Sequence, residues 1–118
     1  MADAGLFIGW GQVVRGREQR AVEVFNESVE YWGALQADGK IEDFEVVLLT
    51  PHGGDLAGFA LLRGSAEQMG ALRADEEFER RVTRADLIVE NQGVVDAALG
   101  EGIGRGMGIY QSEIGELG

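Results

Sequence analysis

The stretch that decides the fold is 41–64, IEDFEVVLLTPHGGDLAGFALLRG. Two runs of mainly apolar residues flank a Pro-His-Gly-Gly turn, so we expect a hairpin of strands 41–50 and 55–63. Successive side chains of a strand point to opposite sides of the sheet, and both runs have apolar residues at successive positions. A sheet built from such strands needs an apolar cover on each of its two faces.

The residues before and after this hairpin predict two helices. Over 17–37, apolar residues recur at spacings of three and four, which is typical of a helix with one buried face. Ser65, followed three residues later by Gln68, forms a capping-box sequence and marks the start of the second helix. We expect that helix to break just before Asp75 and to begin again there.

Two further strands and a tail complete the expected elements. One strand is expected at 5–14, and another lies within 87–99, where Gly93 indicates a bulge. The tail 100–118 begins with a glycine-rich link that does not match the nucleotide-binding glycine pattern. Apolar residues then recur at helical spacing and predict a short C-terminal helix that docks on another surface; they are Met107, Tyr110, Ile114 and Leu117.

The order strand, helix, strand, strand, helix, strand predicts a ferredoxin-like α+β domain at 1–99, followed by the tail. Its four-stranded antiparallel sheet would have the strand order four, one, three, two, with both helices on one face. The other face would be apolar, and a second copy packed sheet to sheet would cover it. That face holds either the alternate residue set or the set Phe7, Val13, Val47, Leu49, Phe59 and Leu61.

Composition limits the classes of partner. The 118 residues have a formal net charge of −11, which disfavours nucleic acid and anionic membrane surfaces. Cysteine is absent, which excludes disulfides and thiolate metal sites. We find neither a secretion signal nor a membrane-spanning run, so we expect an acidic cytoplasmic protein.

The element order, the two-sided strands and the sequence DEEFERRVTRADLIVE at 75–90 resemble the dimeric α+β barrel superfamily. This superfamily contains cofactor-independent monooxygenases, muconolactone-type isomerases, YciI-like proteins and many uncharacterised members. The resemblance covers about 5–99. It implies a ferredoxin-like fold whose sheets pair into a barrel, and it assigns no functional residue by position.

Two polar residues are candidates for chemistry. His52 is the only histidine, and it could act as a general base or bind a metal with Asp55; alternatively, it is a turn residue, which we favour. Asn91, together with its neighbour Gln92, could orient a ligand carbonyl or could bond backbone at a sheet edge or bulge, which we also favour. We assign neither as catalytic and expect no metal and no cofactor.

Aromatic residues could line a pocket between the sheet and the helices, or could simply form the core. They are Trp10, Tyr31, Trp32, Phe44 and Phe59. We therefore expect a homodimer that binds a small apolar ligand. The alternative is a cofactor-independent monooxygenase or isomerase that acts on a small aromatic or quinone-like substrate.

Overall fold

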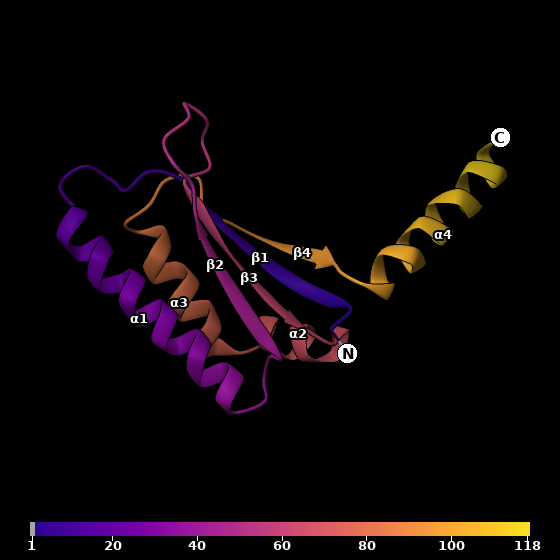
Figure 1. Cartoon of the computed structure of the whole chain (residues 1–118), viewed down its shortest axis with the longest axis horizontal. Coiled ribbons are helices and arrows are strands. Elements are labelled where there is room, and N and C mark those ends of the chain that lie inside the picture. The colour runs from indigo at the N-terminus through magenta and orange to yellow at the C-terminus, as the bar shows by residue number, and fades with distance from the viewer. Residues whose placement is uncertain (1) are drawn as a thin grey trace.

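A computed structural model describes residues 2–118, and its centre is one antiparallel sheet (Figure 1). The order of the strands across the sheet is β2-β3-β1-β4, and every neighbouring pair is antiparallel. This confirms the predicted order, with β1 and β3 in the centre. The strands are β1 (Ala4–Trp10), β2 (Asp43–Leu48), β3 (Gly58–Gly64) and β4 (Gly93–Ala98).

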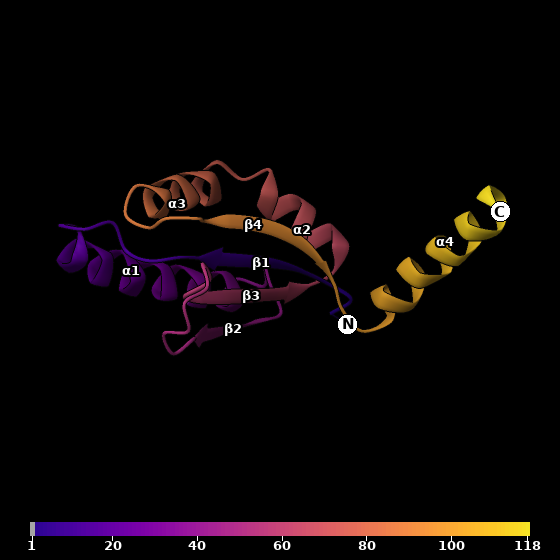
Figure 2. The ribbon, with the colours of Figure 1, turned by 90° about the horizontal axis from the view of Figure 1, so that it is seen from above.

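Helices α1 (Glu18–Ala37), α2 (Ala66–Arg73) and α3 (Glu76–Asp86) lie on one side of the sheet (Figures 1 and 2). The predicted capping box starts α2, because the hydroxyl of Ser65 accepts a hydrogen bond from the Gln68 N–H at 3.1 Å. In return, the Ser65 N–H donates to the Gln68 side-chain oxygen at 2.8 Å. The break before Asp75 separates α2 from α3, as predicted.

The strand register decides which face the helices cover. Leu6 and Leu62 pair across β1 and β3, both are fully buried, and they lie in the core with Trp32 of α1. On the opposite face, Phe7 pairs with both Leu61 and Val95. This uncovered side of the sheet, called the open face below, carries the apolar residues Phe7, Val47, Phe59, Leu61 and Val95.

At one end of the sheet, all four strands are shorter than the sequence predicted. β1 ends at Trp10 because the backbone crowds the next residue: a Cβ on Gly11 would lie 2.7 Å from the carbonyl oxygens of both Asp55 and Glu90. The segment 11–14 then pairs irregularly with 88–90, and a single bridge joins Val13 to Val89.

The loop between β2 and β3 therefore spans 49–57, longer than the predicted turn. Val13 and Leu49, which strand alternation placed with the open face, lie beyond the ends of β1 and β2. Both residues line a cavity on the helix side instead. That part of the predicted face was wrong because strand alternation does not continue where the chain leaves the sheet.

Helix α4 (Glu101–Leu117) is longer than the short helix expected from the tail, because the glycine-rich segment is itself helical. It leaves the sheet after β4 and projects on the side opposite α1 and α3 (Figures 1 and 2). Within residues 2–118, no helix combines the length and the apolar character needed to cross a membrane.

Candidate functional site

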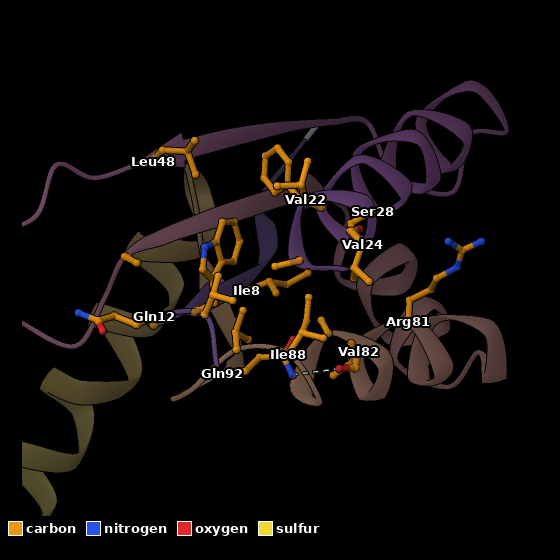
Figure 3. Close-up of a pocket in the computed structure, with 18 of the residues that line it drawn as sticks. Ile8, Gln12, Val22, Val24, Ser28, Leu48, Arg81, Val82, Ile88 and Gln92 are labelled. Atoms are coloured by element: carbon orange, nitrogen blue, oxygen red, sulfur yellow. Dashed lines mark hydrogen bonds between the residues drawn. The ribbon is translucent and has the colours of Figure 1, made fainter. Parts of the chain in front are cut away.

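A cavity of about 580 Å³ lies between α1, α3 and the end of the sheet where the strands stop (Figure 3). The strands contribute Ile8, Trp10 and Leu48, and the irregular segments beyond them contribute Gln12, Val13 and Leu49. The helices and the segment after α3 contribute mainly Ala21, Val22, Val24, Phe25, Ser28, Tyr31, Trp32, Phe78, Val82, Ala85, Ile88 and Gln92. The cavity is thus lined by segments distant in sequence.

The volume of the cavity follows from small side chains at facing positions of the two helices. Ala21 of α1 and Ala85 of α3 belong to one apolar cluster with Val24 and Ile88. Close packing normally fills a protein interior, and larger residues at these helix positions would do so. With alanine on both helices, an apolar space stays open between them.

Two polar side chains at the cavity, Ser28 and Gln92, are hydrogen-bonded to backbone. The Ser28 hydroxyl donates to the Val24 carbonyl at 2.8 Å. The Gln92 amide donates to the Val82 carbonyl at 3.0 Å and so fixes the segment after α3 against that helix (Figure 3). These bonds support the walls and leave the lining largely apolar.

Tyr31 differs from these two residues because its buried polar atom lacks a partner. Its hydroxyl oxygen is buried and forms no hydrogen bond with residues 2–118. Burial raises the pKa of Tyr31 to about 12, and the negative charges of Asp75 and Glu77 act in the same direction. The Arg81 guanidinium opposes this effect and lies 4.8 Å from the centroid of the Tyr31 ring. The phenol is therefore neutral at physiological pH, with a free donor and acceptor.

One ion pair connects the two helices on their outer side, and a second, within α3, positions Arg81. Arg84 of α3 donates to both carboxylate oxygens of Glu27 of α1, at 2.9 and 3.3 Å. The hydrogen bond with Arg84 lowers the pKa of Glu27. Arg81 is held by Glu77 at 2.7 Å, which keeps its guanidinium near the ring of Tyr31. These contacts set the separation of α1 and α3 at the Tyr31 side of the cavity.

The structure brings three of the five aromatic candidates together at the cavity: Trp10, Tyr31 and Trp32. Phe44 packs on the core, with its ring centroid 6.0 Å from that of Trp32. Phe59 lies on the open face and stacks on Phe7 with a centroid distance of 5.0 Å. The placement of Phe44 and Phe59 in one pocket with the other three was wrong, because the register turns Phe59 to the opposite side of the sheet.

His52 and Asn91 lie outside the cavity lining. The Nδ1 atom of His52 accepts from the Gly54 N–H at 3.1 Å, so its Nε2 carries the proton and donates to the Leu56 carbonyl at 2.8 Å. Asn91 is exposed with a φ of 56°, a left-handed conformation that asparagine tolerates in a turn. Both residues lie in loops; His52 is a turn residue there, and the expected backbone bond of Asn91 stays a prediction.

Other cavity residues were missed by sequence reasoning. Val82 and Ile88 come from α3 and the segment that follows it, which the sequence marked only as helix and strand. The adjacent apolar pair Ile88 and Val89, placed before the strand begins, is the one signal that could have indicated them. Among residues 2–118, no group of three or more potential metal-binding side chains comes together.

Neither a protein-family model nor a curated protein matches the sequence. Solved structures do match the fold. A dimeric protein of unknown function and ferredoxin-like fold from Bacteroides fragilis has a TM-score of 0.58 and 18% identity, and the match covers 81% of this chain and 96% of that one.

Two similar structures have names that state an activity. SnoaB, a cofactor-independent oxygenase from Streptomyces nogalater, has a TM-score of 0.54 and 14% identity, covering 84% of this chain and 95% of that one. A putative antibiotic biosynthesis monooxygenase from Chloroflexus aurantiacus has a TM-score of 0.52 and 10% identity, covering 82% and 93%. At these identities the likeness concerns the fold alone, and the chain has the ferredoxin-like α+β fold that these proteins share.

Proposed function

We propose that this protein is a homodimer that binds a small apolar molecule in the cavity between the sheet and helices α1 and α3. The cavity itself supports this proposal most directly. Its volume of about 580 Å³ falls within the roughly 300–1,000 Å³ typical of small-molecule sites. A space of this size with apolar walls is costly to leave unfilled, since its lining loses van der Waals contacts.

The lining defines the chemistry of the ligand. Trp10 and Trp32 offer aromatic surface, and the neutral Tyr31 hydroxyl offers one hydrogen bond. A buried hydroxyl without a partner costs about 1–3 kcal/mol, and a ligand oxygen would remove that cost after a small side-chain shift. The ligand that fits best is therefore a small aromatic molecule with one polar oxygen, uncharged because a charge is costly to bury against a largely apolar lining.

The dimer is proposed to form through the open face. Its centre is apolar, with the Phe7–Phe59 stack beside Val47 and Leu61, and one end of it carries Arg63 paired with Asp43 and Glu45. An apolar centre with a charged rim is the usual anatomy of a protein interface. The similar protein from Bacteroides fragilis is described as dimeric, which supports the same assembly here.

The second candidate is a cofactor-independent monooxygenase or isomerase acting on a small aromatic or quinone-like substrate. The free hydroxyl of Tyr31 favours it, since this group could hydrogen-bond to oxygen on which charge develops. The described activity of SnoaB on a similar fold favours it as well. It ranks second because both ring nitrogens of His52 are engaged within their own loop and away from the cavity.

Ligand binding is tested by filling the cavity. Ala85→Phe, on the cavity wall, should lower the affinity for the neutral fluorescent probe N-phenyl-1-naphthylamine at least tenfold, because the new ring occupies the ligand volume. Ala71→Phe, on the exposed surface of α2, is the matched control and should bind like the wild type. Fluorescence titration measures both. Equal affinities of the two variants would show that the probe binds elsewhere.

The titration of Tyr31 predicts how stability depends on pH. The pKa of this residue is about 12 in the folded state and about 10 in an unfolded chain. Above pH 10 the unfolded state therefore binds fewer protons, so the free energy of unfolding should fall as pH rises from 10 to 12. Tyr31→Phe should lose part of this slope in urea titrations, whereas Tyr110→Phe in α4 should keep it. Identical slopes in all three proteins would contradict the buried phenol.

The enzyme alternative predicts oxygen uptake. With an electron-rich hydroxylated polycyclic aromatic as substrate, an oxygen electrode should record consumption that depends on protein concentration and is lost in Ala85→Phe. Tyr31→Phe should lower the rate at least tenfold if its hydroxyl stabilises developing charge, with ligand affinity changed less. If the substrate binds but neither oxygen uptake nor isomerisation is observed, the enzyme alternative is wrong and the ligand-binding proposal stands.

The dimer is tested on the open face with a residue that is largely exposed in one chain. Val95→Lys places a charge at a position 54% exposed in the monomer, and Leu87→Lys does so at a site 65% exposed near the end of α3. Sedimentation should show a dimer for the wild type and Leu87→Lys, and at least a tenfold weaker dimer for Val95→Lys. Circular dichroism confirms that both variants fold. A monomeric wild type at micromolar concentration would refute the assembly.

A further inference from the structure

The residues at the start of α4 are hydrogen-bonded to and packed against Asp3, which directly precedes β1. The Leu99 N–H donates to the Asp3 carbonyl at 3.1 Å, and the Gly102 N–H donates to the Leu99 carbonyl at 2.8 Å. Gly102 packs so closely on the Asp3 carbonyl that a Cβ at this position would clash with it. The direction in which α4 leaves the sheet is thus set by backbone contacts at its first turn.

Beyond its first turn, α4 has too little intrinsic helix propensity to be stable without contacts to another surface. Its 17 residues include five glycines, and each interior glycine costs about 1 kcal/mol relative to alanine. Isolated helices of about this length are marginal in water even for good helix formers. Yet every residue from Ile103 to Gly118 is exposed in the single chain. A surface outside this chain must therefore stabilise the helix.

Helix α4 has one narrow apolar stripe. Its members follow one another at spacings of four, three, four and three, which is the spacing of a seam between packed helices. They are Ile103, Met107, Tyr110, Ile114 and Leu117, and each is at least 50% exposed. The opposite side carries Arg105, Ser112 and Glu116, and Ile109 is the one exposed large apolar residue of α4 outside the stripe. This two-sided pattern indicates that the stripe is the side to be covered.

The position of α4 identifies what covers it. The helix projects on the side of the open face, away from α1 and α3 (Figures 1 and 2). Paired sheets lie about 10 Å apart. At about 1.5 Å per residue, α4 is about 25 Å long and so extends past a second sheet placed on the open face. A second copy that covers the open face would thus also lie beside α4.

We propose that α4 is an intermolecular arm, which packs its apolar stripe on the second copy of the chain in the sheet-paired dimer. This inference rests on the proposed dimer and adds a second contact to it. Two-fold symmetry makes the contact reciprocal, so each chain gives its α4 to the other. One partner then covers the two apolar surfaces that a single chain leaves exposed, the open face and the stripe of α4.

A pair of substitutions tests the stripe. Met107→Glu places a charge within it, and Ser112→Glu places the same charge on the opposite side of the helix. Met107→Glu should raise the dimer dissociation constant at least tenfold in sedimentation runs over a concentration series, while Ser112→Glu should leave it unchanged. Neither position contacts the ligand cavity, so probe binding by each folded chain serves as the control for folding.

Spin labelling distinguishes contact with the partner from contact within one chain. The sequence has no cysteine, so Ser112→Cys gives a single site for a nitroxide. Mixed dimers of a spin-labelled chain and an isotope-labelled chain should show broadened amide signals in the isotope-labelled chain, and reduction of the nitroxide with ascorbate should restore them. The affected amides would map the surface on which α4 packs.

Three outcomes are distinct. A weaker dimer for Met107→Glu, together with broadening between chains, supports the arm. An unchanged dimer for Met107→Glu without such broadening overturns the arm and leaves the dimer through the open face intact. A wild type that is monomeric at all concentrations overturns both the arm and the proposed dimer.

Discussion

The structure depends on a sheet with two apolar faces and a helical layer that covers only one. Burying a large apolar side chain stabilises a fold by about 1.5–3 kcal/mol. The open face, with Phe7, Phe59 and Leu61, has no cover within one chain, so most of this stabilisation is not obtained there. Stacking of the two phenylalanine rings recovers only part of it. The assembly proposed above would remove this imbalance.

The same sheet explains where the cavity lies. At one end, β1 stops at Trp10, β2 stops at Leu48, and β3 and β4 begin at Gly58 and Gly93. The register places these four residues close to one another across the sheet. Beyond them the crowded backbone at Gly11 prevents regular pairing, and irregular segments replace the sheet as the wall facing α1 and α3. An incomplete sheet under small helical side chains leaves the space that a ligand can fill.

Local sequence signals predicted much of this fold. The capping box at Ser65, the break before Asp75 and the alternation within each strand are set by near neighbours, and the structure confirms them. The ends of the strands were predicted poorly, because β1 stops where the distant residues Asp55 and Glu90 approach Gly11. The length of α4 was also underestimated, since its glycines indicate a loop by propensity alone.

The candidate site was less predictable than the fold because it depends on what each side chain fails to contact. Tyr31 precedes Trp32 in α1, and in the sequence both are simply aromatic residues of one helix. In the structure, Trp32 is a buried core residue, whereas Tyr31 holds a buried hydroxyl that finds no partner among residues 2–118. A free buried donor marks a site only once all its neighbours are known. The missing partner of this hydroxyl, which no local sequence pattern encodes, distinguishes Tyr31 among the buried polar groups of residues 2–118.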